Sequence, residues 1–175
     1  MAAQFKTSSG PRNLGLSAAA GEFVAFLEAD DLWHAEKLER QMTRFEARPE
    51  LDACVAHVQN FWIPELREEE ERFRNHRMSQ PLPGYVTGTL LARTGLFKAI
   101  GGRFNAALRH GDSTDFFLQA AGQGAVIELL PDVLLYRRLH QANRSRLLAS
   151  SSRDEFLKIV KAFLDQRRLR NGTAT

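Results

Sequence analysis

The clearest pattern in the chain is an apolar run, Phe23 to Leu27, that follows Gly21 and ends in a cluster of acidic residues. The run has no helical period, which is typical of a short strand buried on both faces of a sheet. The acidic residues therefore stand at the carboxyl end of this strand, where ligands bind in open α/β sheets. They are Glu28, Asp30 and Asp31.

Helical and extended patterns alternate along the rest of the chain. Leu38, Met42 and Phe45 recur at helical spacing and predict an amphipathic helix over residues 35–48, followed by a strand region over 51–63. This alternation predicts an α/β domain with a mixed, mainly parallel sheet flanked by helices. The other predicted elements are helices over 13–20, 65–77, 97–102, 116–121 and from 152 onwards, a strand over 85–92, and two extended segments within 125–136.

Two local signals refine these elements. Gly88 lies inside the predicted strand over 85–92, where a glycine often marks a close backbone approach. Ser152 followed by Glu155 fits a capping box, which predicts the start of the last helix.

Composition narrows the class of protein. A chain of 175 residues with 43% hydrophobic residues suits one globular core. It has no apolar stretch of membrane-spanning length, and residues 1–10 lack the apolar region of a signal peptide, so we expect a cytoplasmic protein. The single cysteine, Cys54, lies in an apolar run and is expected to be a buried small hydrophobe. The net charge of +3 is dispersed and does not indicate nucleic-acid binding.

The acidic cluster admits two interpretations from the residues alone. Two carboxylates one residue apart can share a hard divalent cation that also holds phosphate oxygens. Alternatively, Asp30 and Asp31 stabilise the start of the following helix, where the helix dipole favours negative charge.

The segment from Arg12 to Gln41 as a whole resembles the central part of family 2 glycosyltransferases, which have the GT-A fold. The resemblance implies an Asp-X-Asp motif that binds Mn or Mg together with a nucleotide-diphosphate sugar. Here the motif falls on Glu28, Ala29 and Asp30, so a longer glutamate replaces the first aspartate. Arg12 and Asn13 open the matched segment and are expected on the same grounds to contribute to cofactor binding.

The resemblance continues through Gly88 to Asn105, which is similar to the family's acceptor side, and through Gly111 to Gln119. The latter resembles the family's Gly-Glu-Asp loop, whose aspartate is the general base for the acceptor hydroxyl. Ser113 takes the position of that base, and serine cannot replace it, so the resemblance implies Asp112 or Asp115 as the base. The alternative is that these carboxylates only cap the helix that follows.

A third matching segment, Tyr136 to Ser145, is similar to the family's closing Tyr-Arg-X-His segment, which reaches back to the diphosphate. Arg138 suits phosphate oxygens. A neutral imidazole can ligate a transition metal, so His140 is expected to contact the diphosphate, the metal or both.

The resemblance spans residues 12–146 and matches only the downstream part of the family's catalytic domain, because no strand of the Val-Ile-Ile-Pro type precedes Arg12. It therefore implies a GT-A domain shortened at its N-terminus, with an irregular segment over 1–11 and a C-terminal helix and tail over 147–175. A sheet without its first strands has an uncovered edge, so we expect a homo-oligomer.

Three hypotheses follow. In the first, the chain is related to enzymes that transfer a sugar from a nucleotide-diphosphate donor to an acceptor hydroxyl with a divalent metal. In the second, it is a non-catalytic remnant, acting as a binding or assembly module or as one part of a split enzyme. The third, an unrelated phosphate-binding α/β protein, requires the order of the motifs to be coincidental.

Overall fold

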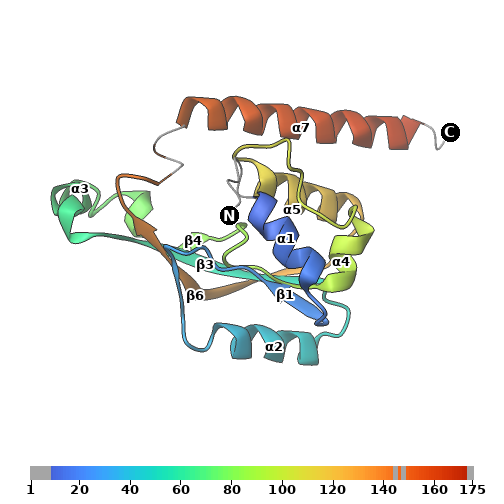
Figure 1. Cartoon of the computed structure of the whole chain (residues 1–175), viewed down its shortest axis with the longest axis horizontal. Coiled ribbons are helices and arrows are strands. Elements are labelled where there is room, and N and C mark those ends of the chain that lie inside the picture. Colours follow the sequence, from blue (N-terminus) through green and yellow to red (C-terminus); the bar gives the residue numbers. More distant parts are fainter. Residues whose placement is uncertain (1–8, 144–145, 147–148, 173–175) are drawn as a thin grey trace, which may run out of the picture.

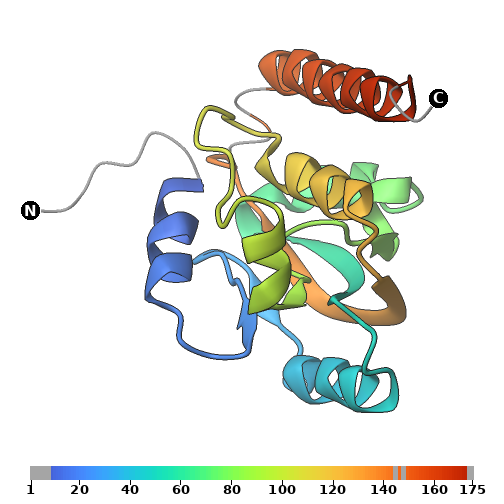
Figure 2. The same ribbon diagram turned by 90° about the vertical axis from the view of Figure 1, so that its right-hand side faces the viewer.

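The computed structural model describes residues 9–143, 146 and 149–172. One sheet lies between helices on its two faces (Figure 1). Helix α2 (Lys37–Ala47) covers one face. The other face carries α1 (Ser9–Ala18), α4 (Thr94–Ala99) and α5 (Asp112–Gly122), with α7 (Ala149–Gly172) outside α5. Figure 2 shows the same order of layers, from α7 through α5 and the sheet to α2.

The sheet is mixed. In order of pairing its strands are β1 (Phe23–Ala25), β5 (Leu91–Arg93), β3 (Ala53–Trp62), β6 (Ile127–Leu139) and β2 (Leu32–Trp33), with β4 (Leu82–Pro83) also paired to β3. The β3–β6 ladder is parallel and contains ten residue pairs. The four other strand pairs are antiparallel, with two or three residue pairs each. The predicted mixed sheet flanked by helices is confirmed, and its parallel part is this central ladder.

The start of β3 is apolar on both faces because both faces are covered. Ala53 and Val55 join the core beneath α1, α4 and α5. Cys54 and Ala56 join the core beneath α2, and Cys54 is fully buried, as expected. This double burial explains why the strand reads as a continuous apolar run rather than an alternating one.

The prediction of two extended segments within 125–136 is wrong, because one strand, β6, runs through Pro131 and Asp132. The register with β3 shifts at this point, on either side of His57. Such an irregularity places Pro131 outside the ladder, where its missing N–H costs no hydrogen bond.

The predicted strand over 85–92 is also mostly wrong, since only Leu91–Arg93 forms β5. The residues before it form turns, in which Thr89 N–H donates to Val86 O at 3.2 Å. The close approach expected at Gly88 is confirmed, because a Cβ there would lie 2.8 Å from Leu135 Cδ2.

The helices differ from their predicted limits for local reasons. α1 begins at Ser9 rather than Asn13, since Pro11 is tolerated in the first turn of a helix. Only α3 (Arg67–Arg72), between short 3₁₀ helices at Pro64–Leu66 and Arg77–Ser79, forms in the charged segment 65–77. Helix α7 begins at Ala149, so Ser152 lies within it and is not its cap. Residues 1–8, 147–148 and 173–175 of the predicted terminal segments lie outside the described residues.

Within the described part of the chain, no helix combines the length and apolar character that a membrane crossing requires.

Candidate functional site

The acidic cluster lies in the turn between β1 and β2, as the apolar run predicted. Phe26 anchors this turn, because its ring packs edge-on against Phe97 and Phe104 at centroid distances of 5.9 and 5.4 Å. The chain then leaves the core, and the carboxylates that follow turn toward two different groups of partners.

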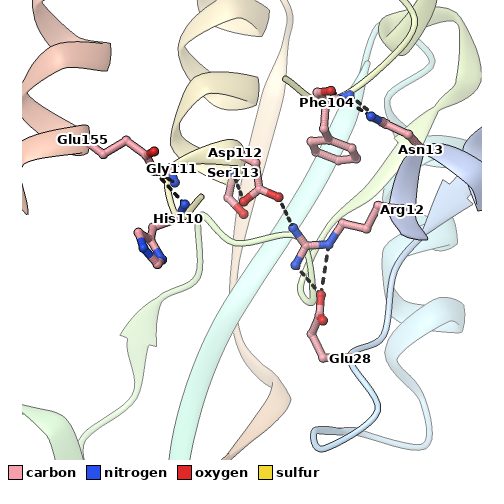
Figure 3. A network of polar contacts seen from close by, with 9 residues as sticks. All are labelled: Arg12, Asn13, Glu28, Phe104, His110, Gly111, Asp112, Ser113 and Glu155. Carbon is pink, nitrogen blue, oxygen red and sulfur yellow. Dashed lines mark hydrogen bonds and ion pairs between the residues drawn. The ribbon is translucent and has the colours of Figure 1, made fainter. Parts of the chain in front are cut away.

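Arg12 joins two of the predicted site residues, although they are far apart in the sequence (Figure 3). Its Nη1 lies 2.5 Å from Asp112 Oδ2, and its Nε donates to Glu28 Oε1 at 3.0 Å. Nη2 contacts the same oxygen of Glu28. The Asp112 side chain is 5% exposed and the Arg12 side chain 13%, so this ion pair is well shielded from water.

The second group lies around Asp30. His140 Nε2 is 2.9 Å from Asp30 Oδ2, and Arg138 Nε donates to the Asp30 carbonyl at 2.9 Å. The Arg138 amide donates to Asp31 Oδ1 at 3.0 Å, while its guanidinium lies 5.0 Å from the centroid of Phe61. The end of β6 is thus attached to the acidic turn, which brings together Asp30, Arg138 and His140 as predicted for one site.

Asp31 takes part in this attachment rather than in the Asp30–His140 pair. Burial raises the pKa of Asp31, and the charge of Asp30 raises it further. The hydrogen bond from the Arg138 amide opposes the shift.

The two candidate bases lie in the first turn of α5. Asp112 accepts the Ser113 amide with Oδ1 at 3.0 Å and holds Arg12 with its other oxygen. Asp115 accepts a hydrogen bond from Gln119 Nε2 at 2.6 Å. Burial raises the pKa of Asp115, the Gln119 hydrogen bond opposes this, and the charge of Asp112 adds to it. Asp115 is therefore a stronger proton acceptor than an ordinary exposed aspartate.

Asn13 has a structural contact that the sequence did not reveal. Its Nδ2 donates to Phe104 O at 2.9 Å, and its Oδ1 accepts the Phe104 amide at 2.7 Å. Its carboxamide thereby fixes the chain around Phe104 on both sides (Figure 3). Cofactor binding by Asn13 stays a prediction that this geometry does not favour.

The loop before β5 is held by three side-chain donors that the sequence pattern did not indicate. Three successive backbone carbonyls of residues 88–90 each accept a side-chain donor from the segment that follows the acidic turn. The three donors recur every four residues. This spacing, directly after the acidic motif, is the sequence signal that could have indicated one face turned toward the loop. The contacts are Trp33 Nε1 to Gly88 O at 2.8 Å, Gln41 Nε2 to Thr89 O at 2.8 Å and Lys37 Nζ to Leu90 O at 3.5 Å.

A further anchor lies beyond the end of β6. Arg146 binds Glu69 of α3 with both terminal nitrogens, and Trp62 Nε1 donates to Glu69 Oε1 at 3.0 Å. The hydrogen bond from Arg146 is the main cause that lowers the pKa of Glu69 to about 2, and the bond from Trp62 adds to it. Helix α3 is therefore bonded to Arg146 through Glu69, and nothing in the run of four consecutive glutamates singles out this residue.

Glu28, Asp30 and His140 were the predicted metal ligands, and they are divided between these two groups. Among residues 9–143, 146 and 149–172, no three His, Cys, Asp or Glu side chains are placed together to hold a metal ion. Asp30 and His140 lie side by side, whereas Glu28 is bound to Arg12.

The mixed sheet has the acidic turn after β1, Arg138 at the end of β6 and His140 directly after it, and its fold is the GT-A fold. Residues 6–107, more than half of the chain, match the family model described as Glycosyl transferase family 2. The chain belongs to this family.

Two curated relatives match over 38 residues, which is 22% of this chain. One is the UDP-Glc:alpha-D-GlcNAc-diphosphoundecaprenol beta-1,3-glucosyltransferase WfgD of Escherichia coli, at 50% identity. The other is the amylovoran biosynthesis glycosyltransferase AmsB of Erwinia amylovora, at 45% identity. The matched stretches span only 15% and 13% of these relatives' own lengths.

Solved structures share the fold at low sequence identity. TarS 1-349 of S. aureus in complex with UDP-GlcNAc has a TM-score of 0.66 at 18% identity, covering 93% of this chain and 47% of TarS 1-349. Glucosyl-3-phosphoglycerate synthase from Mycobacterium tuberculosis, in complex with Mn²⁺, UDP and phosphoglyceric acid, has a TM-score of 0.54 at 15% identity. That match covers 87% of this chain and 52% of the synthase, so this chain spans about half of each structure.

Proposed function

We propose that this chain binds the diphosphate end of a nucleotide sugar and takes part in transferring the sugar to an acceptor hydroxyl. The observation that carries the proposal is the convergence of Asp30, Arg138 and His140 at the end of β1 and β6. A carboxylate, a guanidinium and an imidazole suit a metal-bound diphosphate. Family membership supports the same conclusion.

Two residues fit a divalent cation. A carboxylate oxygen and an imidazole nitrogen are both ligands that Mn²⁺ accepts, and Asp30 Oδ2 and His140 Nε2 lie 2.9 Å apart. Glu28 fits as a third ligand only if its oxygen leaves Arg12. When bound, the cation would neutralise charge on the diphosphate leaving group.

Arg138 and the α5 carboxylates have distinct roles in this proposal. The bond from Arg138 Nε to the Asp30 carbonyl holds its guanidinium beside the metal-binding carboxylate, where it binds diphosphate oxygens. During transfer the acceptor oxygen bonds to the anomeric carbon, the bond from that carbon to the diphosphate breaks, and a base takes the hydroxyl proton. Asp115 suits this role better than Asp112, whose charge is neutralised by Arg12.

Calorimetric titration with UDP-sugars and GDP-sugars in the presence of Mn²⁺ tests the donor site. We expect binding by the native chain and a loss of at least tenfold in affinity for Asp30→Ala, because one ligand of the cation is removed. The exposed Glu39→Ala substitution on α2 is the matched control and should leave affinity unchanged. Equal binding by Asp30→Ala and the native chain would place the donor elsewhere.

A non-catalytic role is the second candidate, and one observation favours it. Ser113 stands where the family's base is expected. A folded native chain that binds no nucleotide sugar in the same titration would support a binding or assembly module, or one part of a split enzyme.

We also propose that a second copy of this chain covers the outer edge of β1. We propose the cytoplasm as its compartment. Among the described residues β1 pairs with β5 alone, and an unpaired edge offers N–H and C=O groups to another strand. Analytical ultracentrifugation is expected to give a dimer or larger oligomer. A sharp monomer peak across the micromolar range would contradict this.

A further inference from the structure

The C-terminal helix α7 supplies a carboxylate to the loop that leads into α5. Glu155 accepts the backbone amides of Arg109 at 2.8 Å, His110 at 2.6 Å and Gly111 at 2.8 Å. Figure 3 shows the contacts with His110 and Gly111. Burial acts to raise the pKa of Glu155, but the three amide donors outweigh it and the pKa is lowered. The carboxylate is therefore ionised at neutral pH and holds three successive amides of one loop.

This contact fixes the loop immediately before α5. Gly111 is the N-cap residue of α5 and has no side chain with which to accept an amide hydrogen. Within the helix, Asp112 accepts the Ser113 amide, while Glu155 accepts the amides of Gly111 and of the two residues before it. The negative charge of Glu155 lies at the favourable end of the α5 dipole.

The packing of α7 is equally specific at this point. Gly111 has φ −93°, so its backbone does not require glycine. A Cβ at Gly111, however, would lie 2.1 Å from Ile159 Cδ1, and Ile159 is 6% exposed. A second glycine, Gly122, lies at the other end of α5. A Cβ there would lie 3.2 Å from Phe163 Cε2. The two glycines let α7 approach α5 along its length.

The loop held by Glu155 continues directly into the acceptor-side carboxylates. Asp112 follows Gly111 and binds Arg12, which in turn binds Glu28 of the acidic turn. Movement of the loop would therefore move Asp112 and Asp115 relative to the donor side of the site.

We propose that Glu155 is a positioning residue. Through it, α7 fixes the position of Asp112 and Asp115 relative to the proposed donor site around Asp30. The inference rests on the proposed transfer reaction, in which Asp115 takes the proton of the acceptor hydroxyl and Asp112 is bound to Arg12. Glu155 touches neither donor nor acceptor and acts through the loop 109–111 alone.

The test compares Glu155→Ala, Glu155→Gln and the neighbouring exposed Asp154→Ala in the full chain. We expect amide hydrogen exchange over 109–115 to accelerate by at least tenfold in Glu155→Ala, less in Glu155→Gln because its carbonyl still accepts, and not at all in Asp154→Ala. We expect kcat for transfer to fall by at least tenfold in Glu155→Ala while the calorimetric affinity for the donor is unchanged. Unchanged exchange, or faster exchange with unchanged kcat, overturns the proposal.

A second pair of variants guards against a general loss of folding. Gly111→Ala should accelerate exchange over the same residues, and Gly111→Ala combined with Ile159→Ala should restore most of the protection, since it removes the clashing methyl group. Absence of any restoration contradicts the proposed packing. If the native chain binds no donor, the proposed function fails, whereas the exchange results still decide whether α7 holds this loop.

Discussion

Replacing Arg12 with alanine is expected to lower the free energy of unfolding by about 3 to 5 kcal/mol at pH 7, the usual cost of removing one partner from a shielded ion pair. The large effect arises at Asp112, whose side chain is 5% exposed and would be left as a charge without its cation. Glu28 contributes less, because 41% of its side chain is exposed to water. Urea denaturation of the native chain and the variant measures the difference.

A double-mutant cycle separates this ion pair from general packing. Arg12→Met combined with Asp112→Asn removes both charges, and the double variant should be more stable than the sum of the two single losses by at least 1 kcal/mol. Arg12→Lys should recover only part of the loss, because a single ammonium cannot reach both carboxylates as the planar guanidinium does. Additive single losses would show that Arg12 and Asp112 are energetically independent.

Local patterns predicted those parts of the fold that depend on neighbouring residues. The apolar run before Glu28 predicted the position of β1, and the spacing of Met42 and Phe45 predicted α2. The run did not predict that β1 ends at Ala25, has only Val24 buried and, in the part of the chain that the structure describes, pairs antiparallel with β5 alone. The Arg12–Asp112 pair joins residues 100 positions apart, and no local signal contains such information. The sequence could therefore suggest which residues belong to the site, but not that Arg12 neutralises one of its carboxylates.

Hydrophobic spacing also assigned the buried face of α2 incorrectly in part. Leu38 is 44% exposed, whereas Lys37 and Gln41 are fully buried. Hydrophobicity places lysine in water, but here the helix turns its polar residues inward because backbone carbonyls of the 88–90 loop need donors there. Tertiary hydrogen bonding outweighed the periodic pattern.

The buried Lys37 leads to the second large expected effect, a rise in stability at alkaline pH. Its Nζ lies 2.7 Å from Gln41 Oε1 and 4.4 Å from the centroid of Trp33, partners that carry no full negative charge. Burial lowers the pKa of Lys37 from 10.5 to about 8. The folded state therefore loses this proton at lower pH than the unfolded state does.

The sign follows from proton linkage. Between about pH 8 and 10.5 the unfolded chain binds more protons at this site than the folded chain, so Lys37 makes stability rise with pH over this window. Below pH 8 the folded protein bears the full cost of the buried charge. Integrated from pH 7 to 10, the contribution is about 2 to 3 kcal/mol in favour of folding.

Lys37→Met should abolish this rise because methionine fills a similar volume without a titrating group. Urea denaturation at pH 7, 8.5 and 10 should show the native chain gaining about 2 to 3 kcal/mol relative to Lys37→Met as the pH rises. Lys98→Met, an exposed site on α4, controls for the loss of one lysine. Parallel stability curves for the native chain and Lys37→Met would contradict this prediction. They would mean that water hydrates the Lys37 ammonium in solution, in place of its contacts with Gln41 and Trp33.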